Sequence, residues 1–335
     1  MSVKPFCFTP VSEEGMTILN VSRLIKYFPV LGGVFLRRTG WVHAVDDVSF
    51  SVEKGKTFGL VGESGCGKTT LGRCIMGLYD LTGGSVAVQG QSISNLTGFQ
   101  KKKLATHLQM IFQDPYESLD PRQTVQQILE EKYRIHGHDS SHLSREIRQL
   151  LSQVGLSKDS LSRYPHEFSG GQRQRIGIAR AVSMHPEIII CDEPVSALDV
   201  SVQSKILNLL LELQQTLGLT YVFISHDLSV VRHMSDQIGV MYLGKIVEMA
   251  DAQDIYDNAR HPYTRALLSA VPVPDPDTEP RRIILTGEVP SVENPPSGCR
   301  FHTRCPHVAD ICRQEPPALI SKGNDTRHVA ACHFF

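Results

Sequence analysis

The sequence predicts an α/β fold: a core with a mainly parallel sheet, an inserted α-helical subdomain and a small, irregular, cysteine-rich C-terminal extension. Three observations lead to this prediction. Short apolar segments of strand length alternate with helical patterns, as in folds whose parallel strands are joined by helices. Between about residues 114 and 178 the pattern is helical only. After about residue 260, prolines and cysteines replace both patterns.

Length and charge limit the classes of partner. The chain has 335 residues, enough for one large domain and a smaller one. Its 34 Lys and Arg balance 35 Asp and Glu, for a net charge of −1, so we expect no nucleic-acid partner. There is no signal-peptide pattern, and no apolar run approaches the roughly 20 residues of a membrane-spanning helix. We expect a soluble chain whose membrane passage is provided by other subunits.

A phosphate-binding loop is predicted directly after the buried strand Thr57–Val61. The loop, Gly62–Thr69, matches G-x-x-x-x-G-K-[ST] in full, between a strand and a helix. Its glycines let backbone N–H groups turn toward phosphates. Lys68 supplies charge for the β and γ oxygens, and the Thr69 hydroxyl is placed to ligate Mg²⁺. The residues expected to bind the nucleotide here are Gly62, Ser64, Gly65, Cys66, Gly67, Lys68, Thr69 and Thr70. We interpret the cysteine of this loop as a tolerated small residue, not a redox switch.

An acidic pair follows the apolar strand Glu187–Cys191. Asp192 stands at the carboxyl end of this strand, where a partner of Mg²⁺ is expected beside a phosphate loop. The adjacent Glu193 is suited to polarise a water molecule in line with the γ-phosphate. We therefore expect Asp192 to hold Mg²⁺ and Glu193 to act as the general base.

Gln113 and His226 follow two further predicted strands, Leu108–Phe112 and Thr220–Ile224. Open α/β sheets gather their ligands at the carboxyl ends of the strands. His226 is therefore expected to contact the γ-phosphate or the attacking water. Gln113 occupies a similar position.

A Ser-Gly-Gly-Gln turn, Ser169–Gln172, begins a basic helix about a hundred residues after the phosphate loop. Its two glycines allow a close backbone approach, the serine hydroxyl adds a donor, and a helix N-terminus follows. This arrangement suits a γ-phosphate. Because the chain already has a complete phosphate loop, we interpret the turn as half of a second site.

Taken in order, these motifs resemble those of the nucleotide-binding subunit of an ABC transporter, over about residues 17–260. The resemblance implies a P-loop NTPase (RecA-like) core that binds ATP and Mg²⁺. The motifs are the Walker A loop Gly62–Thr69, the Q-loop Gln113, the signature Ser169–Gln172, Walker B Asp192–Glu193, the D-loop Ser196–Asp199 and the switch His226. The resemblance further implies that Gln113 senses the γ-phosphate and joins Thr69 and Asp192 at Mg²⁺, and that Asp199 contributes to the nucleotide site. Phe168 stands where the signature usually has leucine.

Such subunits usually stack an aromatic ring on adenine, upstream of the phosphate loop. Tyr27 and Phe28 lie in the right region, and we assign the role to Phe28. The insertion Gly32–Trp41 changes the spacing to the loop, and the alternative that both rings are buried under a strand stays open.

Four of the eight cysteines fall within the last 37 residues, with the spacing C-x5-C-x6-C-x19-C. They are Cys299, Cys305, Cys312 and Cys332. Structural disulfides are disfavoured in a reducing compartment, so four thiolates suit an iron–sulfur cluster or zinc. The spacing matches neither a zinc knuckle nor a ferredoxin, and His302, His307 and His333 are alternative zinc ligands. Spacing alone leaves both metals open.

The C-terminal extension, residues 261–335, resembles that of dipeptide and oligopeptide importer ATPases, specifically the F-type subunit. The resemblance rests on the segment His261–Leu268, the segment Gly287–Ser291 and the cysteines. Seven prolines between Pro272 and Pro296 predict an extended linker. In this family the cysteines can hold a [4Fe–4S] cluster, so the resemblance implies a structural cluster here, with Zn²⁺ or free thiols as the alternatives.

The resemblance also implies the assembly. We expect a heterodimer with a second homologous ATPase subunit, two transmembrane permease subunits and an extracytoplasmic substrate-binding protein. The chain would lie peripherally on the cytoplasmic face of the inner (plasma) membrane and power uptake of dipeptides or oligopeptides. Related ATPases serve nickel or glutathione uptake, and a soluble ABC ATPase without a transport role is the alternative from another class.

Overall fold

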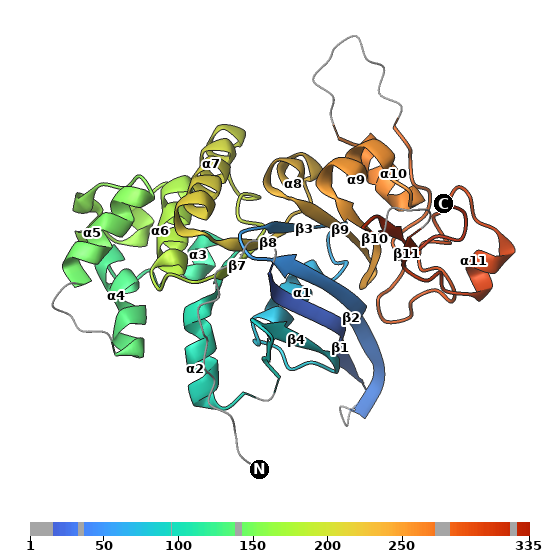
Figure 1. The fold of residues 1–335 in the computed structure, drawn as a ribbon, viewed down its shortest axis with the longest axis horizontal. Helices are drawn as coiled ribbons and strands as arrows, with labels where there is room; N and C mark the ends of the chain where they lie inside the picture. The colour runs from blue at the N-terminus through green and yellow to red at the C-terminus, as the bar shows by residue number, and fades with distance from the viewer. Residues whose placement is uncertain (1–15, 33–36, 95, 138–142, 272–281, 322–326) are drawn as a thin grey trace, which may run out of the picture. The chain divides into compact units, whose positions relative to one another are not determined.

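The computed structural model describes residues 16–32, 37–94, 96–137, 143–271, 282–321 and 327–335. They form two compact units. The first comprises residues up to 18, 52–56 and 95–223, and the second comprises residues 19–51, 57–94 and 224–335. The elements of both are labelled in Figure 1. The grouping places no boundary at residue 260, and the expected domain limits 17–260 and 261–335 stay predictions.

The first unit contains three short buried strands. They are β6 (Leu108–Ile111), β7 (Ile188–Asp192) and β8 (Thr220–Ile224). β6 and β7 run parallel, with Leu108 opposite Ile188, and β8 lies on the other side of β7. All their residues except Gln109 are apolar, aromatic or at a strand end, as expected for parallel strands without a solvated face.

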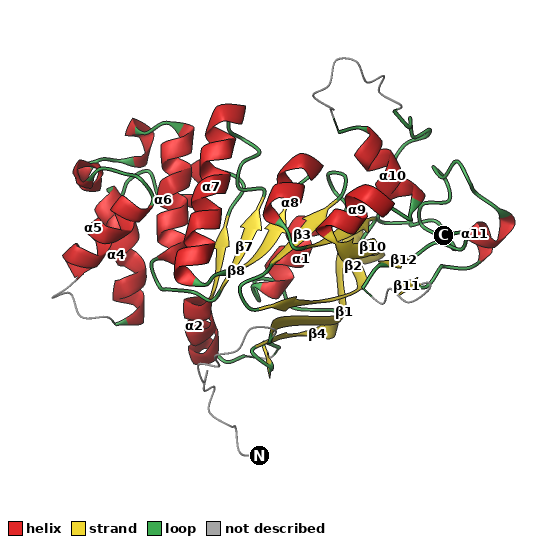
Figure 2. Ribbon diagram, turned by 45° about the horizontal axis from the view of Figure 1, so that its top comes forward, coloured by secondary structure: helices red, strands yellow, loops and turns green. Residues whose placement is uncertain are grey.

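Helices make up most of the first unit. They are α2 (Gly98–His107), α3 (Pro115–Ser118), α4 (Val125–His136), α5 (Leu143–Gln153), α6 (Gly170–Val182) and α7 (Val200–Leu217), with 3₁₀ turns at Lys158–Ser162 and Pro165–Glu167. α4 begins at Thr124 with a reciprocal capping box to Gln127. Figure 2 shows α4, α5 and α6 grouped together. The predicted helical insertion is confirmed.

The second unit contains two sets of strands. The four-stranded sheet has the order β2-β1-β4-β5, with β1 (Thr17–Gly32), β2 (Arg37–Glu53), β4 (Gly83–Val88) and β5 (Gln91–Ser92). The other strands follow the order β11-β12-β10-β9-β3, with β3 (Thr57–Val61), β9 (Gln237–Tyr242), β10 (Lys245–Asp251), β11 (Ile320–Ser321) and β12 (Val329–Ala330). β3 pairs with β9 in parallel, and β9 pairs with β10 antiparallel.

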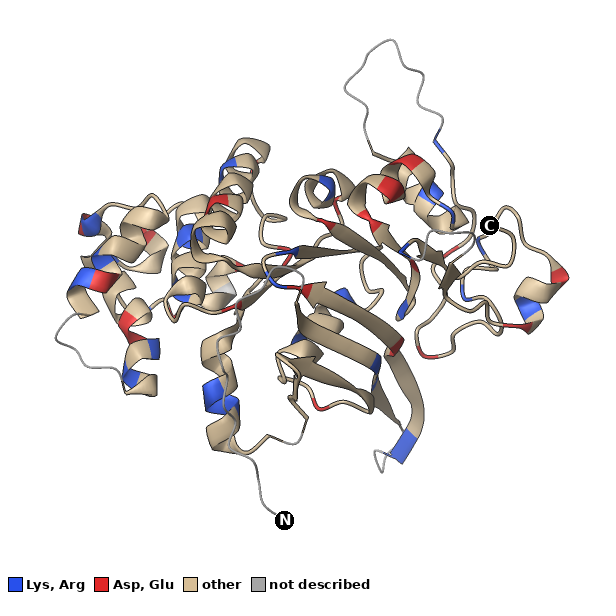
Figure 3. Ribbon diagram, viewed as in Figure 1, with Lys and Arg blue, Asp and Glu red and all other residues tan. Residues whose placement is uncertain are grey.

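Five helices accompany these strands: α1 (Lys68–Ile75), α8 (Leu228–Met234), α9 (Ala252–Asn258), α10 (Pro262–Ser269) and α11 (Asp310–Gln314). Among the described residues, no helix has the length and apolar character needed to cross a membrane. Basic and acidic residues are interspersed on the elements (Figure 3).

The C-terminal residues are part of the core of the second unit. β12 pairs with β10, with Ala330 opposite Glu248. Phe301 is only 1% exposed, and its ring lies 5.3 Å from that of Tyr242 and 5.4 Å from that of Tyr263. Residues 272–281 of the expected proline linker lie outside the described residues, and residues 282–296 contain neither helix nor strand. The described residues of the extension are therefore packed into the unit, and a separate Cys-rich extension stays a prediction.

Candidate nucleotide-binding site

The phosphate loop leaves the buried strand β3 and enters α1. Its geometry requires glycine at two positions. Gly67 has a φ of 110°, and a Cβ there would lie 2.0 Å from the carbonyl oxygen of Ala44. At Gly62, a Cβ would lie 2.2 Å from the carbonyl oxygen of Met241. The strand, the helix N-terminus and these close approaches fix the loop in the form that presents backbone N–H groups to an anion.

Lys68 lies inside this loop. Its ammonium group donates hydrogen bonds to the carbonyl oxygens of Gly62, at 2.8 Å, and Glu63, at 3.0 Å. The residue is 4% exposed. Burial raises the pKa of the neighbouring Cys66 thiol, which keeps it protonated and agrees with a packing role for this cysteine. The loop thus concentrates one buried positive charge where a phosphate chain would lie.

Two predicted catalytic residues meet in the first unit. The side-chain amide of Gln113 donates a hydrogen bond to the Glu193 carboxylate at 3.1 Å. Glu193 has a φ of 46°, a left-handed conformation that is uncommon for residues other than glycine and often marks functional sites. Asp192 ends β7 and is buried. The ends of β6 and β7 therefore gather an amide and two carboxylates.

The Ser-Gly-Gly-Gln turn begins α6 in the same unit. The Ser169 hydroxyl accepts from the N–H of Gln172, and the Gln172 side chain accepts from the N–H of Ser169 at 3.0 Å. This capping box leaves the first N–H groups of the helix at its positive end for another acceptor. A Cβ at Gly171 would lie 2.4 Å from Val202 of α7, so the second glycine is required by packing.

The remaining motif residues lie at element ends. His226 follows β8, is exposed and belongs to the second unit. Asp199 precedes α7 in the first unit, is exposed, and its carbonyl oxygen accepts from the N–H groups of Val202 and Gln203. The predicted site residues are therefore divided between the two units. The second unit contains the phosphate loop, Phe28 and His226. The first unit contains the remaining predicted residues, which are Gln113, Ser169–Gln172, Asp192, Glu193 and Asp199.

The two candidate adenine aromatics lie in β1 with different partners. The Tyr27 hydroxyl donates to Asp46 at 2.6 Å, and its ring lies 4.2 Å from that of His43. Burial and this bond raise the pKa of Tyr27 to about 12. Phe28 is half-buried, 5.3 Å from the ring of Tyr79. The assignment of Phe28 to adenine stays a prediction, and residues 33–36 of the nearby insertion lie outside the described residues.

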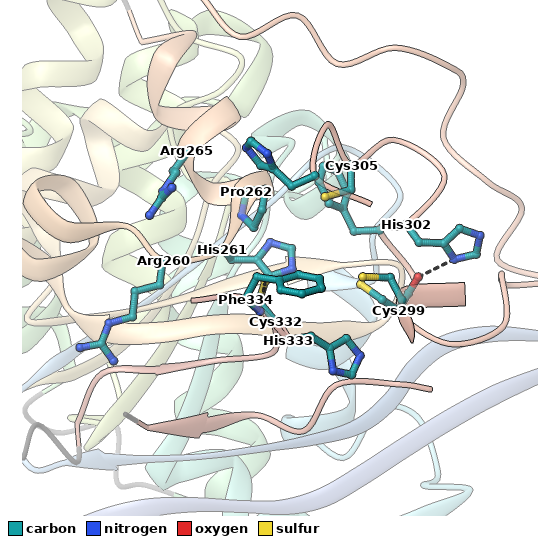
Figure 4. A pocket seen from close by; sticks show the side chains of 13 residues that line it. Arg260, His261, Pro262, Arg265, Cys299, His302, Cys305, Cys332, His333 and Phe334 are labelled. Carbon is teal, nitrogen blue, oxygen red and sulfur yellow. Dashed lines mark hydrogen bonds between the residues drawn. The ribbon is translucent and has the colours of Figure 1, made fainter. Parts of the chain in front are cut away.

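The prediction of a metal cluster in the extension is wrong. A cavity of about 300 Å³ is lined by all four C-terminal cysteines, together with histidines and Phe334 (Figure 4). Yet among the described residues no three His, Cys, Asp or Glu side chains form a group that could hold a metal ion, and the four cysteines are free. Burial raises the pKa of Cys299 to about 11, so the thiol stays neutral. These residues fit neither an iron–sulfur cluster nor zinc.

Sequence reasoning also missed neighbours of the phosphate loop. The N–H of Gly244 donates to the carbonyl oxygen of Cys66, and that of Glu63 donates to the hydroxyl of Tyr263, both at 2.9 Å. Arg304 forms an ion pair with Glu63. The signal for Tyr263 was present in the His-Pro-Tyr segment, but no local pattern links it to a loop 200 residues away.

Comparisons with known proteins agree with this geometry. Residues 45–196 match the ABC transporter family, and residues 247–312 match the family described as oligopeptide/dipeptide transporter, C-terminal region. The oligopeptide transport ATP-binding protein AppF of Bacillus subtilis is 52% identical over 331 residues, which cover 98% of this chain and 99% of AppF.

Two solved structures share the fold. CbiO1 from Clostridium perfringens, part of the ABC transporter complex cbiONQ, has a TM-score of 0.63 and 24% identity, over 73% of this chain and 92% of its own. The ATP-binding cassette MJ0796, solved as a dimer in a post-hydrolysis state with ADP and phosphate, has a TM-score of 0.62 and 25% identity, over 70% of this chain and 99% of its own. These likenesses confirm the predicted P-loop NTPase fold class.

Proposed function

Because this chain belongs to the ABC transporter family, in its branch of oligopeptide transport ATP-binding proteins, we propose that it is the ATP-hydrolysing subunit of a peptide importer. It converts ATP and water to ADP and phosphate and couples this reaction to the uptake of dipeptides or oligopeptides. The relatives named above give no support to nickel or glutathione as the cargo, or to a role outside transport.

We propose that the loop amides, Lys68, Thr69 and Thr70 bind the ATP phosphates. The buried ammonium of Lys68 and the N-terminus of α1 support this assignment. Mg²⁺ prefers oxygen ligands, and Thr69, Asp192 and Gln113 offer a hydroxyl, a carboxylate and an amide oxygen. When bound, Mg²⁺ neutralises charge on the β and γ oxygens.

Glu193 is the proposed general base. A carboxylate next to the γ-phosphate can accept the proton of the attacking water. Its hydrogen bond with Gln113 orients the carboxylate before substrate arrives, which supports this role. His226 is proposed to hold the γ-phosphate, and Asp199 to contribute from the start of α7.

We propose that the Ser169–Gln172 turn acts on ATP bound to a second, homologous ATPase subunit. The capping box and the positive end of the 13-residue helix α6 make this turn a source of hydrogen-bond donors for a γ-phosphate. The heterodimer, the two transmembrane permease subunits, the extracytoplasmic substrate-binding protein and the position on the cytoplasmic face of the membrane are proposals that follow from the family.

The observation that carries the proposal is one chain with both a complete phosphate loop and a capped Ser-Gly-Gly-Gln turn. The test is to measure ATP binding and hydrolysis by the purified chain, alone and with its partner ATPase. We expect ATP binding by the chain alone and a large increase in hydrolysis with the partner. Full hydrolysis by the chain alone, as a homodimer, would contradict the heterodimer.

A further inference from the structure

Glu63, the second residue of the phosphate loop, is held by two residues of the C-terminal extension. The guanidinium of Arg304 donates to both carboxylate oxygens, at 2.7 and 3.1 Å. The hydroxyl of Tyr263 accepts from the backbone N–H of Glu63 at 2.9 Å. Arg304, 241 residues further along the chain, therefore fixes the side chain of Glu63, and Tyr263, 200 residues further along, fixes its backbone.

Both contacts are made by buried side chains. Tyr263 is 0% exposed and Arg304 is 9% exposed. A two-pronged bond between a guanidinium and a carboxylate fixes orientation as well as distance, which a lysine at the same position would not do. Tyr263 also packs against Tyr242, with ring centroids 4.7 Å apart.

The His-Pro-Tyr segment explains how Tyr263 is positioned. His261 caps α10 by accepting from the N–H of Tyr263 at its Nδ1, at 3.1 Å, and Pro262 occupies the first helical turn. The fully buried carboxylate of Glu248 accepts from the N–H groups of Arg260, at 2.6 Å, and His261, at 3.0 Å. The start of α10 is thus anchored to β10, and its second residue, Tyr263, reaches the loop.

The extension also borders the space beside the loop. The N–H of His43 in β2 donates to the carbonyl oxygen of Val292 at 2.9 Å. A cavity of about 260 Å³ is lined by the loop residues Glu63–Cys66, by Tyr242 and Leu243, and by the extension residues Val289–Val292. The loop and the extension therefore share one cavity next to the predicted phosphate site.

We propose that Tyr263 and Arg304 are positioning residues which, through Glu63, hold the phosphate loop in its ATP-binding conformation. The proposal rests on the proposed function. The loop contains three glycines with positive φ, at positions 62, 65 and 67, and glycine-rich backbone loses much conformational entropy when ordered. Ordering by the extension lowers the part of this cost that falls on ATP binding. The extension thereby becomes part of the nucleotide site.

The test compares three conservative variants of the full-length chain. Tyr263→Phe removes the acceptor and keeps the ring. Arg304→Lys keeps the positive charge but removes the second hydrogen bond to the Glu63 carboxylate. Glu63→Gln removes the negative charge of the ion pair with Arg304. We expect each to raise the Kd for ATP about tenfold. In the assembled transporter we expect KM to rise with kcat at saturating ATP nearly unchanged.

Two controls separate this effect from general destabilisation. Tyr256→Phe also deletes a tyrosine hydroxyl that donates to a backbone carbonyl, that of Leu228, far from the loop in sequence. It should lower the melting temperature and leave the Kd unchanged. If Tyr263→Phe does not fold, the Kd for ATP of the Arg304→Lys and Glu63→Gln variants tests the proposal.

Wild-type affinity for ATP in all the folded variants, or an equal rise in the Tyr256→Phe control, would overturn the proposal. Failure of the wild-type chain itself to bind ATP would instead contradict the proposed function.

Discussion

Gln113 and Glu193 are joined by a hydrogen bond of 3.1 Å between the side-chain amide and the carboxylate. They follow adjacent parallel strands, β6 and β7, and lie 80 residues apart in the chain. Glu193 has a left-handed backbone conformation, with a φ of 46°. A costly conformation at an expected base is typical of catalytic sites, where the surrounding structure compensates for it.

The first prediction concerns the base. Glu193→Gln keeps the size of the side chain and cannot accept a proton from water. We expect the variant to bind ATP with wild-type affinity and to lose at least about a hundredfold in turnover, the usual contribution of general base catalysis. Phosphate release and ATP binding measure the two effects. Glu187→Gln, just before the same strand, should be close to wild type, and retained hydrolysis by Glu193→Gln would refute the assignment.

The second prediction separates steric clash from backbone strain by comparing two glycines, one in the phosphate loop and one just after α1. Gly67 and Gly77 both have positive φ, of 110° and 69°, but only Gly67 is crowded, since a Cβ at Gly77 would have no atom within 4 Å. Gly77→Ala should lower stability by about 1–2 kcal/mol, the cost of a left-handed residue with a Cβ. Gly67→Ala should cost more and abolish ATP binding. Urea unfolding and ATP binding measure both, and equal losses would contradict the clash.

The third prediction separates the two roles of Ser169. Aspartate caps helices as well as serine does, but it brings a negative charge. Ser169→Asp should therefore keep the stability of α6, whereas Ser169→Ala should lower stability by about 1 kcal/mol. Both should lose ATP hydrolysis in the heterodimer, because the aspartate repels a γ-phosphate and the alanine donates nothing to it. Active Ser169→Asp protein would show that the turn serves only as a cap.

Local patterns were sufficient where chemistry follows directly from a strand or helix end. The loop between β3 and α1, the acidic pair at the end of β7 and the cap of α6 are each formed by a few consecutive residues, so a local motif was enough to predict these structural features. The contact of Glu63 with Tyr263 and Arg304 depends on tertiary packing of distant segments, which no local pattern encodes.

For the cysteines, in contrast, the sequence led to a site that the described part of the structure does not have. Their grouping within the last 37 residues indicated a metal site, and the family resemblance, not their spacing, implied an iron–sulfur cluster. Spacing does not fix where side chains point, and the cysteines line one cavity without forming a group that could hold a metal ion among the described residues.

The last prediction uses the pH dependence of His261. This histidine is 1% exposed, and burial lowers its pKa from the ordinary 6.5 to about 3. Its neutral Nδ1 accepts the N–H that starts α10. Between pH 6.5 and 3 this site therefore binds up to one more proton in the unfolded chain than in the folded chain, so the contribution of His261 to stability falls as the pH falls through this range.

His261→Asn tests this directly, because asparagine also caps helices and does not titrate. The variant should lose a constant amount of stability to its smaller volume and should show a flatter fall between pH 6 and 4, by up to about 1.4 kcal/mol per pH unit. The nearby pair Glu248 and His328, which share a hydrogen bond of 2.7 Å, is unchanged in the variant. Urea unfolding at a series of pH values gives the two slopes. Parallel curves would mean that His261 is protonated in the folded chain, and that the start of α10 is held by Glu248 rather than by the histidine cap.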